Sequence, residues 1–137
     1  MKKAVIFTLL VVVFSGVWFF YNRIYSIKLN YVEPKTTFND KSSINESDIV
    51  VKITAQGFVP SSINIKKGKK VFWLNESGTL AWPASNPHPT HSDYPGFDPE
   101  LPMPVNQSWS FVFNRVGRWG YHNHLNSAFR GVVNVSE

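Results

Sequence analysis

The sequence contains no cysteine, and this absence excludes several kinds of site. No disulfide can brace the fold, and no thiolate can ligate zinc, an iron–sulfur cluster or blue copper, or act as a nucleophile. Charged residues are also few, at 17% of the chain. Aromatic residues are plentiful at 15%, which provides a large core for 137 residues and excludes disorder by composition.

The excess of basic residues does not indicate nucleic-acid binding. The net charge is +5, but the only basic cluster is Lys66–Lys70, and its central Gly68 predicts a solvated hairpin tip between two strands. No segment interleaves basic and aromatic residues as nucleic-acid modules do. We therefore expect no nucleic-acid partner.

An uncharged apolar run covers Ala4–Tyr21, with Lys2 and Lys3 before it and Arg23 behind it. Eighteen helical residues span about 27 Å, enough to cross the hydrocarbon core of a bilayer. The run ends in the aromatic residues 18–21, which are typical of a membrane interface. We predict an uncleaved single-pass anchor over residues 1–25, with the lipid bilayer as its partner.

A cleaved signal peptide is the alternative, because its basic start and apolar run look the same. No small-x-small cleavage site follows the run, and bulky aromatics end it. We therefore expect a cell-membrane protein whose C-terminal domain is extracytoplasmic, either periplasmic or at the cell surface. The polar residues 26–48 show no sustained period and predict a flexible tether.

Short strands separated by turn signals fill the rest of the chain. Apolar alternation predicts an all-β domain over residues 49–137, an antiparallel sandwich or barrel. The predicted strands are Ile49–Ala55, Ser62–Lys66, Lys70–Asn75, Gln107–Phe113, Trp119–His124 and Gly131–Val135. The proline-rich segment Pro83–Pro104 holds seven of the nine prolines, so it cannot be a central strand. Ordered loops of this length are usually functional.

Several motifs of this domain resemble the cupredoxin family. They are Gln56-Gly-Phe-Val-Pro60, Ile63-x-Ile-x-x-Gly68, Val71-x-Trp-x-Asn75, Gly117-x-Trp-x-Tyr121 and Gly131-x-Val-x-Val135. The resemblance implies a Greek-key β-sandwich that carries copper at one end. The expected architecture is thus an all-β, cupredoxin-like sandwich behind a single N-terminal transmembrane helix.

The family's type 1 copper ligands are missing. Aligned on Gly131, the positions of its cysteine, second histidine and methionine are held by Asn123, Asn126 and Phe129, and that of the first histidine by about Trp82. The resemblance therefore implies no blue-copper site and no electron shuttle tuned by a thiolate. We expect Trp82 to fill the place of the first ligand.

Four histidines form two pairs at chelating spacings, His88 with His91 and His122 with His124. Residues i and i+2 of a strand project from one face, and the first pair flanks a stiff proline-containing turn. The second pair also resembles the Tyr-His-x-His motif of multicopper oxidases. We predict that these four residues bind copper, with zinc as the alternative. One shared ion, two separate ions and a site completed across an oligomer all remain open.

Two carboxylates and two tyrosines lie near these histidines in the sequence. Asp93 and Asp98 are candidate oxygen ligands or partners of a histidine ring N–H, whereas Tyr94 and Tyr121 are expected in the core. The predicted function is copper binding, delivery or tolerance without catalysis. The alternatives are a metal-free accessory module with a membrane or periplasmic protein partner, and a histidine-ligated metalloenzyme that uses Asp93 or Tyr94.

Overall fold

The computed structural model describes residues 16–23 and 36–137, which fall into two units divided between Lys35 and Thr36. Residues 16–23 are helical. In the two described ranges, no helix combines the length and the apolar composition needed to span a bilayer. Most of the predicted anchor and the first part of the predicted tether lie outside these residues, so the anchor stays a prediction.

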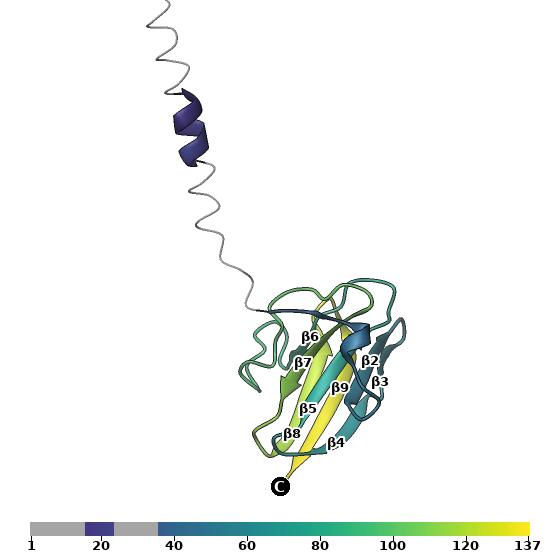
Figure 1. The fold of residues 1–137 in the computed structure, drawn as a ribbon. Helices are drawn as coiled ribbons and strands as arrows, with labels where there is room; N and C mark the ends of the chain where they lie inside the picture. The colour runs from purple at the N-terminus through teal and green to yellow at the C-terminus, as the bar shows by residue number, and fades with distance from the viewer. Residues whose placement is uncertain (1–15, 24–35) are drawn as a thin grey trace, which may run out of the picture. The chain divides into compact units, whose positions relative to one another are not determined.

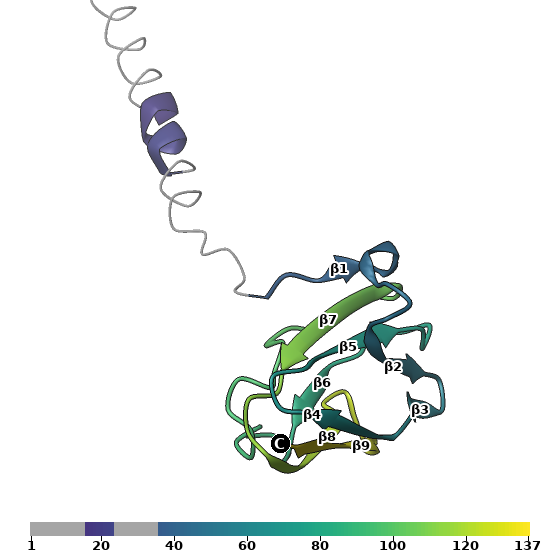
Figure 2. The ribbon, with the colours of Figure 1, turned by 60° about the horizontal axis from the view of Figure 1, so that its bottom comes forward.

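The second unit is a β-sandwich of two sheets (Figures 1 and 2). The first sheet has the order β1-β7-β5-β2-β3, and the second has the order β4-β9-β8-β6. The strands are β1 (Asn39–Asp40), β2 (Ile49–Thr54), β3 (Gly57–Val59), β4 (Ser62–Lys66), β5 (Lys70–Asn75), β6 (Pro83–Ser85), β7 (Gln107–Val112), β8 (Gly117–Asn123) and β9 (Asn126–Ser136). A 3-10 turn, η1 (Lys41–Ser43), follows β1.

Both sheets are mixed, which corrects the expectation of a purely antiparallel sandwich. β2 pairs with β5 in parallel, and β4 pairs with β9 in parallel. Because β4 and β5 lie in different sheets, the basic segment Lys66–Lys70 connects the two layers and is not the tip of a hairpin. The sandwich itself is confirmed, and Figure 2 shows its two layers.

Aromatic side chains fill the space between the sheets, as their abundance predicts. Trp73 of β5 is fully buried and contacts Phe97, Trp109, Phe113 and Tyr121 at ring-centroid distances of 4.8 to 6.2 Å. These rings come from both sheets and from the proline-rich segment. Burial of each such side chain contributes about 1.5–3 kcal/mol, so this cluster is a large contribution to the stability of the sandwich.

The folded unit begins earlier than the sequence predicts. Asn39 and Asp40 pair with Ser108 and Gln107 of β7, and Phe38 packs against the core. Residues 36–48 therefore belong to the compact unit, whereas the sequence places them in a tether. A two-residue strand lacks the length for apolar alternation to be visible in the sequence, which explains the difference.

Hydrogen bonds and buried aromatic rings hold the proline-rich segment against the sandwich. It starts with β6, an edge strand, as its proline content requires. The Ser85 amide donates to the Phe97 carbonyl over 2.8 Å, and the Phe97 ring is fully buried. Tyr94 is buried as well, and its hydroxyl accepts from the Asn114 amide. The residues between these anchors, 86–93, are thereby positioned over the outer face of β8.

Candidate metal centre

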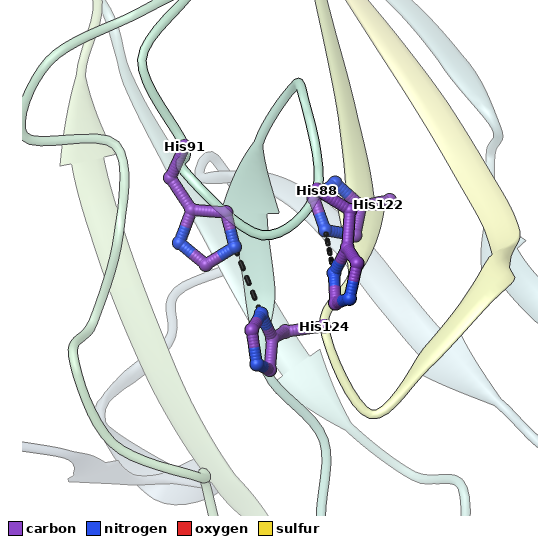
Figure 3. Close-up of side chains that lie close together, drawn as sticks. All are labelled: His88, His91, His122 and His124. Atoms are coloured by element: carbon purple, nitrogen blue, oxygen red, sulfur yellow. Dashed lines mark hydrogen bonds between the residues drawn. The ribbon is translucent and has the colours of Figure 1, made fainter.

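The four histidines meet at one point on the second sheet (Figure 3). His122 lies in β8, His124 directly follows β8, and His88 and His91 lie in the proline-rich segment. Each offers one ring nitrogen, and the four nitrogens lie within 4.8 Å of one another. His91 and His122 are buried, His124 is partly buried and His88 is exposed.

The separations of two nitrogen pairs in the cluster fit a common metal ion. His88 Nδ1 lies 3.2 Å from His122 Nε2, and His124 Nδ1 lies 2.9 Å from His91 Nε2. Imidazole nitrogens bind zinc at about 2.0–2.1 Å, so two such ligands stand about 2.9 Å apart at a right angle and about 3.3 Å apart at a tetrahedral angle. Both pairs agree with this range, so these residues fit a metal ion held by imidazoles.

The two most buried rings are oriented by hydrogen bonds to their other nitrogen. His91 Nδ1 lies 2.5 Å from Asp98 Oδ2, and His122 Nδ1 lies 3.1 Å from Asn86 Oδ1. Both partners are oxygens that accept a hydrogen bond from Nδ1–H, so Nε2 is the unprotonated nitrogen of His91 and of His122. This is the usual arrangement around metal-binding histidines. The lone pairs of these two Nε2 atoms point to Nδ1 of His124 and of His88, respectively. His88 and His124 face the cluster through Nδ1 instead.

Of the two candidate carboxylates, only Asp98 contacts a histidine. Besides His91, it accepts hydrogen bonds from the Trp82 indole N–H at 2.8 Å and the Glu100 amide at 2.7 Å. The Trp82 ring lies over His124 at a centroid distance of 4.5 Å. Trp82 therefore packs beside the histidine cluster, which corrects the expectation that its side chain fills the place of a type 1 ligand.

The protein environment favours the neutral, metal-binding form of His122 and His124. Burial lowers the pKa of His122 to about 4, assisted by the other histidines and by Arg130. Burial and its histidine neighbours also lower the pKa of His124. For Asp98, burial opposes ionisation, but the hydrogen bonds from His91, Glu100 and Trp82 outweigh it and lower the pKa of the carboxyl. The cluster thus places the neutral imidazoles of His122 and His124 near one carboxylate.

Comparison with solved structures identifies the architecture. An amicyanin variant with copper(I) has a TM-score of 0.63 at 21% identity, over 75% of this chain and 95% of that chain. The chain has the cupredoxin fold. Amicyanin from Paracoccus versutus gives a TM-score of 0.62 at 20% identity, over 73% and 92%. No protein-family model and no curated protein matches the sequence.

The positions that resemble the type 1 ligands of cupredoxins carry no metal-binding side chain. Asn123 Oδ1 accepts hydrogen bonds from the amides of Trp82 and Leu125, so this side chain braces two backbone segments. Asn123, Asn126 and Phe129 line a separate cavity of about 350 Å³, away from the four histidines. This cupredoxin-like chain lacks the type 1 cysteine, and its histidine cluster lies on the opposite face of β8 from Asn123. The alternation of side chains along the strand predicts this for His122 and His124.

Sequence reasoning did not find Asn86. Its side chain packs against Gly120 of β8 so closely that a Cβ there would lie 2.5 Å from Asn86 Nδ2. Its backbone amide also donates to the Gly120 carbonyl at 3.1 Å. A glycine in the middle of a strand often marks such a close approach, and this was the available signal.

Proposed function

We propose that this protein binds one copper ion through His88, His91, His122 and His124. The observation that carries the proposal is the convergence of four imidazole rings, two of them oriented by Asp98 and Asn86. Imidazole nitrogens suit both copper and zinc, and Cu(II) binds more tightly at equal availability. The bound ion would supply a compact double positive charge, and copper would add one-electron chemistry.

Metal holding, rather than catalysis, is the proposed role. Four imidazoles leave few positions on the ion for a substrate, whereas catalytic metal sites usually keep one open. The metalloenzyme alternative needs Asp93 or Tyr94 at the ion. Tyr94 is buried in the aromatic core, and Asp93 is outside the group of potential ligands.

The proposed setting is the outer side of a cell membrane, where the protein would act in copper delivery or tolerance. The uncharged run Ala4–Tyr21 supports an anchor, and the side chains of residues 17–21 are exposed apolar groups. A membrane or periplasmic partner protein that receives the ion is part of this proposal.

The test is metal uptake by the full chain, purified in detergent. Wild-type protein should retain close to one equivalent of Cu(II), with a type 2 EPR signal and no strong band near about 600 nm, because thiolate is absent. The double variant His122→Ala/His124→Ala should retain none. Lys67→Ala/Lys69→Ala, between β4 and β5, is the matched control and should bind normally. Uptake of zinc alone would identify zinc as the cargo, and no uptake of either metal would favour the metal-free accessory module.

A further inference from the structure

Arg130 lies beside the histidine cluster on the outer face of the second sheet. It is the cross-strand partner of His122, so the two side chains share one face of the β8–β9 pair. Its Nε donates to the Ser127 carbonyl at 3.2 Å, which fixes the start of the guanidinium group. The remaining guanidinium donors are not used by this contact.

A cavity of about 320 Å³ adjoins this arginine and the cluster. It is lined by Asn86, Pro87, His88, His122, Ser127 and Arg130. Two of these residues belong to the proposed metal centre, and three others carry hydrogen-bond donors: the amide of Asn86, the hydroxyl of Ser127 and the guanidinium. The volume is well above the roughly 30 Å³ that a single water occupies, so a small organic molecule fits.

With a metal ion bound, positive charge around this cavity would exceed negative charge. Within residues 16–23 and 36–137, no Asp or Glu carboxylate forms an ion pair with Arg130. The cavity lining has no carboxylate either. A divalent ion and Arg130 together carry three positive charges against the single negative charge of Asp98. Like charges at such short range repel, and an anion between them would remove the repulsion.

We propose that the cavity binds a small carboxylate, which pairs with Arg130 and lies next to the metal ion. The planar guanidinium matches the two oxygens of a carboxylate, and a halide cannot make this paired contact. The site would then accept copper together with a small organic acid, a carrier from which the ion is received or to which it is released. This inference rests on the proposed copper-binding function.

The probe is acetate labelled with ¹³C at the carboxyl carbon, added to the full chain in detergent. With Cu(II)-loaded protein, the paramagnetic ion should accelerate carboxyl relaxation, whereas the Zn(II)-loaded protein should not. Arg130→Gln should raise the dissociation constant of acetate by about tenfold, the effect expected of a lost charge-assisted hydrogen bond. Arg130→Lys, which keeps the charge but loses the paired contact, should bind acetate more weakly than wild type and more tightly than Arg130→Gln. Arg118→Gln, an exposed arginine of β8, removes the same charge outside the cavity and should leave acetate binding unchanged.

A second readout follows from the repulsion between like charges. In buffer without carboxylate, Arg130→Gln should bind the metal more tightly than wild type does, and added acetate should reduce this difference. Chloride at the same ionic strength should not. Equal behaviour of Arg130→Gln and Arg118→Gln, or an equal effect of chloride, would overturn the inference while normal metal uptake leaves the proposed function intact. Failure of wild-type metal uptake would instead contradict the proposed function itself.

Discussion

His91 Nδ1 and Asp98 Oδ2 lie 2.5 Å apart, and this contact ties one histidine of the cluster to a carboxylate. The carboxylate fixes the ring so that Nε2 faces the other histidines, and it raises the basicity of that nitrogen. The contact joins two residues of the proline-rich segment, so this loop carries both a candidate ligand and the group that orients it.

Asp98→Asn should weaken metal binding by about 10- to 100-fold, the usual cost of losing such a partner. The asparagine carbonyl oxygen can still accept from the Trp82 indole and the Glu100 amide, so the loop should keep its conformation. Competition with a chromophoric chelator measures the change. Asp93→Asn removes the same charge from the same segment and should have little effect. Equal losses in the two variants would show that only the overall charge matters.

Gly120→Ala should reduce metal affinity through Asn86. The new Cβ would lie 2.5 Å from Asn86 Nδ2, which displaces the amide and deprives His122 Nδ1 of its acceptor. We expect a loss of about tenfold, at the low end for such partners. Asn86→Ala should cause a similar loss, and the double variant should add little to either. Additive losses would mean that Gly120 acts by another route.

The metal-free protein should lose stability as the pH falls from about 6.5 to about 4. In the unfolded chain, His122 takes up a proton near its ordinary pKa of 6.5, whereas burial holds its pKa at about 4 in the folded state. The unfolded state therefore binds more protons across this range, and acid favours it. Above pH 6.5 the contribution of this residue is constant.

Urea unfolding of metal-free protein at pH 7.5, 5.5 and 4.5 measures this dependence. His122→Gln lacks the group and should show a shallower decline over the same interval. The pKa of Asp98 is lowered, so this carboxyl takes up its proton only below the tested interval. A decline in His122→Gln as steep as that of wild type would show that residues other than His122 cause the acid sensitivity.

The sequence predicted the long strands of the sandwich better than the short ones. Strands such as β5 (Lys70–Asn75) have enough alternating apolar residues to be recognised, whereas the three residues of β3 and β6 and the two of β1 do not. Their pairing depends on contacts with distant strands, such as Asn39 with Ser108.

The histidine cluster was predictable because its members are paired in the sequence, while its details depend on the fold. Spacing along β8 placed His122 and His124 together on the outer face. It could not show that the loop brings His88 against His122, which nitrogen of each ring faces inward, or that Asn86 is a partner. These features arise from packing of the proline-rich segment, which Phe97 anchors in the core.

The contribution of residues 36–48 to the stability of the sandwich can be tested by truncation. A fragment of residues 36–137 should have a higher free energy of unfolding than a fragment of residues 49–137. The shorter fragment loses the pairing of β1 with β7 and the partial burial of Phe38, together about 1–3 kcal/mol. Chemical denaturation measures the free energy of unfolding of both fragments. Equal values would show that residues 36–48 do not stabilise the sandwich, as expected of a tether.

The most direct test of the metal centre is X-ray absorption spectroscopy of the full chain loaded with one equivalent of Cu(II). The structure predicts nitrogen ligands at about 2.0 Å, with the outer-shell scattering of four imidazoles and no sulfur. His122→Ala should reduce the imidazole scattering. A spectrum with one or two imidazoles, unchanged by His122→Ala, would contradict the four-histidine site.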